Sequence, residues 1–128
     1  MSFPADEHAL KKGTAELLVL AQLEDGPRHG YDIATRIEQR SSGAVSFNVA
    51  SLYPVLYRLE AHGSIAGWWV ERAGERRRRF YKLTQAGRKR LLQQRQTWST
   101  FMAAVQRAAG LLGRTPEIDA GGSVVAAD

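Results

Sequence analysis

Breaks that contain glycine or proline divide the first 75 residues of this chain into short segments. They are "EDGPRHG" at 24–30, "SSG" at 41–43, "HG" at 62–63 and "AGE" at 73–75. Glycine favours the C-terminal cap of a helix and proline cannot continue one, so helices in this part of the chain must be short. The helix expected to be long follows these breaks.

Apolar spacing predicts three helices between the breaks. The first spans about 10–23, with Thr14 as a candidate N-cap for part of it, and the second spans about 31–40. Asn48 is the best candidate N-cap for the third, with the neighbouring serines as rivals, and Gly63 is expected to end it.

The third helical segment, "SLYPVLYRLEAHGSI" at 51–65, has an unusual outward face. One face is apolar, formed by Leu52, Val55, Leu56 and Leu59. Its other positions hold two tyrosines, an arginine and Pro54 in place of the usual glutamates and lysines. Because proline lacks an N–H and clashes with the preceding turn, we expect 49–54 to be irregular or the helix to start late.

Two extended runs follow the third helix. Residues 65–72 and 78–83 are rich in aromatic and β-branched types, and the turn at 73–75 joins them into a two-stranded hairpin. Three short helices and a hairpin are the element order of a winged helix-turn-helix, although a three-helix bundle with an unrelated hairpin has the same count. The expected fold is therefore mainly α (α+β), with a winged helix-turn-helix domain at 9–83.

A long C-terminal helix is expected over 84–112, with Thr84 as its N-cap. Apolar residues recur along it at heptad-like spacing, and the expected dimerisation residues are Leu91, Trp98, Phe101, Met102, Val105 and Leu112. A helix of this length reaches about 40 Å, which a domain of this size cannot cover. We therefore expect a homodimer, the alternative being a helix folded back on its own domain. The tail at 113–128 is expected to be disordered.

Positive charge is concentrated in the second half of the chain. Between Arg76 and Pro116 there are eleven basic residues and no acid, whereas the first 75 residues hold seven basic residues and ten acids. This asymmetry favours a polyanionic partner, the alternative being an ordinary solvated face. Strand alternation would send two of the four consecutive arginines at 76–79 to each face of the hairpin.

In a helix-turn-helix the second helix of the pair enters the major groove of DNA. Asparagine can pair with adenine, arginine with guanine or phosphate, and a tyrosine hydroxyl with phosphate. The candidate DNA-binding residues are Asn48, Ser51, Tyr53, Pro54, Tyr57, Arg58, Arg76, Arg77, Arg78 and Arg79. Two alternatives stay open: each tyrosine could pack on the hairpin or the first helix, and Arg58 could pair near Glu60 or with solvent.

Several classes of protein are disfavoured. The chain has no cysteine, its three histidines are isolated, and no nucleophile, phosphate-loop or metalloprotease motif occurs. We therefore expect neither an enzyme, a cofactor nor a metal site. Neither a membrane-spanning run nor a leader peptide is visible, and the absence of cysteine fits a reducing cytoplasm.

Three stretches together resemble the PadR family of bacterial transcriptional regulators, in its group with a short C-terminus. They are "LVLAQLEDGPRHGYDI" at 18–33, "SLYPVLYRLEAHGSI" at 51–65 and "RRRRFYKLTQAGRKRL" at 76–91. The resemblance implies a homodimer that binds palindromic operators, usually as a repressor, with an arginine-rich wing. It also implies that a small aromatic effector could bind beside Trp98, which is otherwise interface packing.

Two rival functions come from other classes. The winged helix could be a protein-interaction module, with the basic wing meeting an acidic partner. The chain could also be a small-molecule-binding dimer without specific DNA binding. One further expectation concerns Trp68 and Trp69: because neighbours in a strand face opposite sides, one should be buried and the other exposed or in an interface.

Overall fold

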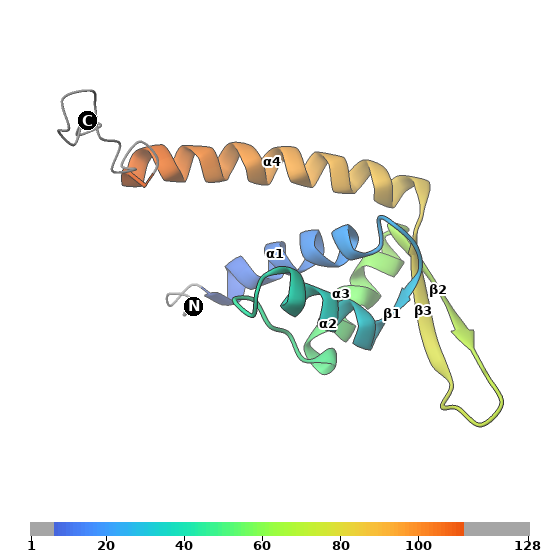
Figure 1. The fold of residues 1–128 in the computed structure, drawn as a ribbon. Coiled ribbons are helices and arrows are strands. Elements are labelled where there is room, and N and C mark those ends of the chain that lie inside the picture. Colours follow the sequence, from blue (N-terminus) through green and yellow to red (C-terminus); the bar gives the residue numbers. More distant parts are fainter. Residues whose placement is uncertain (1–6, 112–128) are drawn as a thin grey trace. The chain divides into compact units, whose positions relative to one another are not determined.

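The computed structural model describes residues 7–111, which form four helices and a three-stranded antiparallel sheet (Figure 1). In chain order the elements are α1 (Glu7–Gln22), β1 (Arg28–His29), α2 (Gly30–Arg40), α3 (Val49–Ala61), β2 (Ile65–Val70), β3 (Arg78–Leu83) and α4 (Gln85–Ala109). A first compact unit ends at Leu92, and a second unit begins at Gln93. The tail at 113–128, predicted to be disordered, lies outside the described residues.

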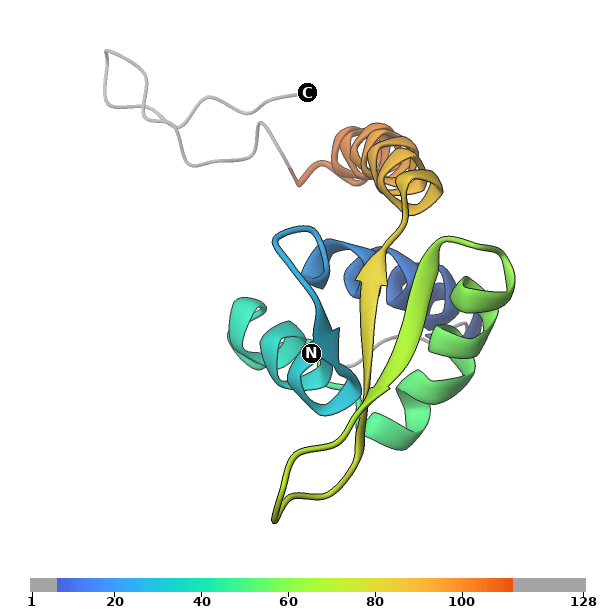
Figure 2. The ribbon, with the colours of Figure 1, turned by 90° about the vertical axis from the view of Figure 1, so that its right-hand side faces the viewer.

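The first unit is built around one apolar core. Figure 2 looks onto the strands, with α1, α2 and α3 behind and beside them. The core side chains come from all three helices, from β2 and β3 and from the start of α4; the most buried large ones are Leu20, Leu23, Ile33, Ile37, Leu52, Leu56, Leu59, Ile65, Tyr81 and Leu91. The fold is therefore the predicted winged helix with a long C-terminal helix.

Helix α3 is regular from its first residue, so the prediction of an irregular start was wrong. The Asn48 side chain caps it by accepting a hydrogen bond of 2.8 Å from the backbone N–H of Ser51. Pro54 lies inside the helix. Its missing N–H removes only the bond to the carbonyl of Ala50, which belongs to an exposed residue in the first turn, where water can satisfy it.

The end of α3 agrees with the prediction. Gly63 adopts a φ of +75°, and its N–H bonds to the carbonyl of Glu60 at 3.0 Å. The N–H of Ser64 bonds to the carbonyl of Leu59 at 2.9 Å, which completes a Schellman motif. This sharp end turns the chain directly into β2.

The sheet contains a strand that the sequence analysis missed. The two residues of β1 pair with β3, Arg28 opposite Tyr81 and His29 opposite Phe80. A two-residue strand is too short to show alternation, and polar contacts hold it in place: Arg28 pairs with Asp25 at 3.1 Å and with Asp32 at 3.0 Å. The predicted two-stranded hairpin is therefore the larger part of a three-stranded sheet.

The hairpin itself is close to the prediction. Strands β2 and β3 pair from Ile65 opposite Leu83 to Val70 opposite Arg78. The connecting loop covers 71–77, longer than the predicted turn, and Gly74 within it has a φ of +78°. Two of the four consecutive arginines therefore lie in the loop and two in β3.

The two ends of the first unit differ from the prediction. Helix α1 begins at Glu7, so Thr14 lies inside the helix and does not cap it. At the other end Thr84 does cap α4, accepting a bond of 3.0 Å from the N–H of Gly87. Gly87 and Leu91 are buried in the first unit, which therefore extends past residue 83, where the sequence analysis ended the domain.

The helices do not have the character of membrane spans. Within residues 7–111, no helix is both long and apolar enough to cross a bilayer.

Candidate nucleic-acid interface

The outward face of α3 is exposed, as predicted. Ser51, Tyr53, Pro54 and Tyr57 are all exposed, whereas the apolar positions of the same helix are buried. Tyr53 is 41% exposed and Tyr57 is 60% exposed, and their rings stack on each other with centroids 6.1 Å apart. Neither tyrosine is buried against the hairpin or α1, so the packing alternative does not describe them.

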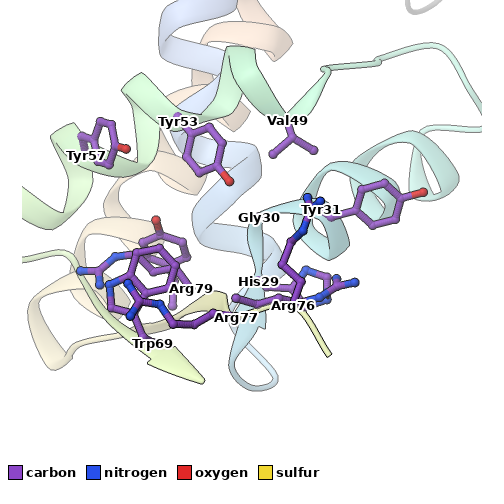
Figure 3. Close-up of a pocket in the computed structure, with 12 residues that line it drawn as sticks. His29, Gly30, Tyr31, Val49, Tyr53, Tyr57, Trp69, Arg76, Arg77 and Arg79 are labelled. Carbon is purple, nitrogen blue, oxygen red and sulfur yellow. The ribbon is translucent and has the colours of Figure 1, made fainter. Parts of the chain in front are cut away.

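A hollow of about 470 Å³ separates this face of α3 from the hairpin (Figure 3). Its walls come from α3, from the start of α2 and from the hairpin; the lining residues are His29, Gly30, Tyr31, Val49, Tyr53, Tyr57, Trp69, Arg76, Arg77, Arg78, Arg79 and Tyr81. The lining holds four arginines and no carboxylate. The hollow is therefore both basic and aromatic, the composition that a polyanion with flat bases would meet.

The four arginines have different surroundings. Arg76 makes no ion pair among the described residues, and the Arg77 guanidinium lies 4.2 Å from the ring centroid of Trp69 and 3.7 Å from Glu71. Arg78 lies 3.1 Å from Nε2 of His29. Arg79 donates a hydrogen bond of 2.6 Å to Glu60 in α3. All four line the hollow, but their contacts divide them in pairs. Arg77 and Arg79 lie over Trp69, whereas Arg76 and Arg78 also line a second hollow with His29 and Phe80, so two arginines go to each face as expected.

The two adjacent tryptophans do point to opposite faces, but neither is buried. Trp68 is 37% exposed and stacks on Phe80 with centroids 6.3 Å apart, and Trp69 is 52% exposed beneath the arginines. The expectation that one is buried was wrong. Among the residues of β2 only Ile65, at its start, is buried. Trp68 and Trp69 lie further along the strand toward the hairpin loop.

His29 is the residue at this surface that the sequence analysis missed. Its Nδ1 accepts a hydrogen bond of 3.2 Å from the N–H of Asp32, which caps α2, and its ring packs edge-on against Phe80 at 5.3 Å. Burial and the positive charge of Arg78 hold its pKa below the usual histidine value. The neutral ring therefore joins the start of α2 to the hairpin. The sequence signal for this cap was the acid three residues later, Asp32, in the first turn of the helix. Histidine is not a usual N-cap, so the signal was weak.

Arg58 and Asn48 are not free to reach a ligand with their whole side chains. Arg58 pairs with Glu16 of α1 at 3.4 Å and is not among the residues that line the hollow. Asn48 uses its carbonyl oxygen to cap α3. The structure therefore brings together the tyrosines and the wing arginines but directs Arg58 to another helix, which neither sequence alternative named.

Glu16 joins three helices of the first unit. Besides Arg58 it accepts a bond of 2.8 Å from Arg90 in the first turns of α4. Burial would raise the pKa of Glu16, but Arg90 and Arg58 together outweigh it and hold the pKa below its ordinary value. An ionised Glu16 therefore ties α1 to both α3 and α4.

The predicted dimerisation residues divide into two groups. Leu91 belongs to the core of the first unit, because it faces inward in the second turn of α4, so it is not available to a second copy. In the second unit Phe101 and Met102 are exposed, Val105 is half-buried, and Trp98 packs edge-on against Phe101 at 6.1 Å. Leu112 lies outside the described residues.

The described residues contain no cluster of three or more histidine, aspartate or glutamate side chains that could hold a metal.

The features described above define a winged helix-turn-helix protein. They are three helices, a capped second helix of the pair with an exposed polar and aromatic face, and an arginine-rich hairpin. A sequence model described as the transcriptional regulator PadR-like family matches residues 19–93. The chain belongs to this family of transcriptional regulators, which are transcription factors and not enzymes.

Similar proteins extend this finding. A Streptococcus mutans protein of known structure is 29% identical, with a TM-score of 0.70 over 91% of this chain and 99% of its own. An uncharacterized 37.1 kDa protein in a Streptomyces fradiae transposon is 42% identical, over 64% of this chain and 22% of that protein. Bacillus subtilis PadR, solved in complex with operator DNA, is 24% identical with a TM-score of 0.58, over 62% of this chain and 45% of its own.

Proposed function

We propose that this protein binds a pseudo-palindromic operator as a homodimer and represses transcription there. In each protomer α3 would enter a major groove while the arginine-rich hairpin lies along the neighbouring backbone or minor groove. The observation that carries the proposal is the hollow in which Tyr53 and Tyr57 face four arginines, with no carboxylate in its lining. A transcriptional regulator acts where the chromosome is, so we place it in the cytoplasm.

The composition of the α3 face supports DNA as the partner over an acidic protein. Ser51 and the two tyrosines offer hydroxyls, and Pro54 offers a compact apolar surface that lets the helix backbone approach a base edge. An acidic protein partner could be bound by the arginines alone and would not require the hydroxyls or Pro54. The family membership and the operator complex of Bacillus subtilis PadR point the same way.

The second unit supplies the basis for a dimer. Phe101 and Met102 are exposed on α4 close to the half-buried Trp98, and an apolar face of this kind is stabilised when a second copy covers it. Trp98 and Phe101 meet edge to face, which leaves aromatic surface for a flat ligand. A small aromatic effector bound there would release the operator by changing how the two heads are held.

The test is a titration of the full chain against labelled DNA from its own upstream region, with scrambled DNA alongside, at several salt concentrations. We expect upstream DNA to bind on the order of 10³-fold more tightly, with a steep salt dependence. Arg77→Gln should weaken binding to both DNAs, whereas Arg107→Gln removes another exposed charge, in the last turn of α4, and should change little.

The outcomes separate the rival functions. Equal and weak binding of both DNAs at low salt would overturn the claim of a specific operator in that region. If neither DNA binds while an acidic protein is retained through Arg77, the chain is a protein-interaction module. If only an aromatic compound binds, detected by quenching of tryptophan fluorescence that Trp98→Phe abolishes, it is a small-molecule-binding dimer.

A further inference from the structure

The four consecutive arginines of the hairpin have two different roles. We infer that Arg79 is a positioning residue, which fixes the hairpin against α3, and that it does not contact DNA itself. The inference rests on the proposed DNA binding and assigns the phosphate contacts to the arginines of the loop, Arg76 and Arg77. From the sequence all four are candidate DNA contacts, and only the contacts in the structure separate Arg79 from the loop arginines.

The Arg79 side chain is held by a short, partly buried ion pair. Its Nη2 lies 2.6 Å from Oε2 of Glu60, and the two side chains are only 24% and 29% exposed. Charge-assisted hydrogen bonds of this length between partly buried groups are the strong ones. By comparison the pair of Arg77 with Glu71 spans 3.7 Å between side chains that are more than half exposed, so it can exchange readily for a phosphate.

Two aromatic rings also hold the Arg79 guanidinium. Its Cζ lies 5.5 Å from the ring centroid of Trp69 and 5.7 Å from that of the buried Tyr81. Figure 3 shows Arg79 grouped with Arg77 over Trp69, on the hairpin wall of the hollow and across from Tyr57 on α3. The side chain thus spans from β3 to α3 across the inner face of the hairpin.

The sequence leaves space for this arrangement at one position. A Cβ added at Gly67, in β2, would lie 2.9 Å from Nη2 and 3.0 Å from Cζ of Arg79. These atoms are the far end of a flexible side chain, so Gly67→Ala would displace the guanidinium and leave the backbone in place. Alanine is tolerated in a strand at least as well as glycine, so this substitution disturbs Arg79 without removing its charge.

The link joins the two elements that would have to contact DNA together. With the link intact, the angle between hairpin and α3 is set before binding; without it, the hairpin must be ordered during binding, at a cost in affinity. A phosphate-binding arginine behaves differently, because removing it also removes counterion release and flattens the dependence of log K on log[salt] by about 0.9.

The experiment measures operator affinity and its salt slope for Arg79→Gln, Arg77→Gln, Glu60→Gln and Gly67→Ala, each first shown to be folded by circular dichroism and thermal unfolding. Arg79→Gln, Glu60→Gln and Gly67→Ala should each weaken operator binding by about fivefold to tenfold, and Arg79→Gln should do so with an unchanged slope. Arg77→Gln should weaken binding and lower the slope by about 0.9 for each phosphate that is no longer neutralised.

A double-mutant cycle supplies a readout that a purely structural role would not change. If Arg79 acts by placing the loop, Arg77→Gln should cost clearly less affinity in the Arg79→Gln background than in the native protein. A slope that falls as much for Arg79→Gln as for Arg77→Gln, or additive losses of affinity in the cycle, would overturn the inference. Absence of operator binding by the native protein would instead overturn the proposed function, so the two failures are distinguishable.

Discussion

At the scale of single residues, His29 combines two structural tasks. Its Nδ1 caps α2, while its ring packs edge-on against Phe80 of the hairpin, close to Arg78. An imidazole whose Nδ1 accepts a hydrogen bond must stay unprotonated there. Protonation would therefore remove the cap and place a second positive charge beside Arg78.

This predicts a pH effect on folding. Burial and Arg78 lower the pKa of His29 in the folded state, so the unfolded chain binds the proton more readily. The stability that the neutral His29 ring contributes is fully present above about pH 6.5, the pKa of histidine in the unfolded chain. It is lost as the pH falls through the pKa of His29 in the folded state. We expect the melting temperature to fall on acidification below about pH 6.5.

His29→Asn is the matched variant for this prediction. Asparagine is a good N-cap, so the cap survives, but it does not titrate. The difference in melting temperature between pH 7 and pH 5 should be smaller in His29→Asn than in the native protein. An equal difference in both proteins would assign the effect to other groups.

At the scale of elements, Glu16 ties α1 to α3 through Arg58 and to α4 through Arg90. Glu16→Gln should lower the free energy of unfolding by about 1–3 kcal/mol, because it leaves two partly buried arginines without a charged partner. Denaturant titration measures this. The pKa of Glu16 is lowered in the folded state. The difference in free energy of unfolding between the native protein and Glu16→Gln should therefore persist at neutral pH and decrease as the pH drops through the pKa of Glu16 in the folded state.

A second prediction at this scale concerns Gly87. A Cβ at this position would overlap the backbone carbonyl of Ser64, which cannot move aside as a flexible side chain can. Gly87→Ala should therefore destabilise the protein by about 3 kcal/mol, despite the higher helix propensity of alanine. Gln85→Ala, at an exposed position of the same turn, is the control and should change the melting temperature little.

The elements show how far the sequence alone could lead. Periodicity, the Asn48 cap and the Gly63 stop were enough to predict the position and the end of α3, because those signals are local, whereas the regular start around Pro54 was not predicted. Strand β1 could not be predicted, since two residues carry no periodicity and the strand depends on ion pairs of Arg28. The same holds for Arg58, Arg79 and Leu91, whose partners lie between 19 and 42 residues away or in the distant core.

At the scale of the whole molecule, the exposed apolar residues of α4 predict a homodimer. Phe101→Glu or Met102→Glu would place a charge in the expected interface, and sedimentation should show a shift from dimer to monomer. Operator affinity should fall with it, because one head alone contacts one half-site. Gln96→Glu adds the same charge to an exposed position outside the predicted dimerisation residues and is the control. A native protein that sediments as a monomer at micromolar concentration would contradict the dimer.

The hydrogen bond between Arg79 and Glu60 has a consequence for the search along a chromosome. A regulator meets about 10⁶–10⁹ competing stretches of DNA, and every cation free to touch phosphate strengthens its hold on all of them alike. Keeping one of four wing arginines in a hydrogen bond to Glu60 lowers that common background while the tyrosine face of α3 is unaffected. We therefore expect shorter pauses on unrelated DNA, and faster arrival at the operator, than four free arginines would permit.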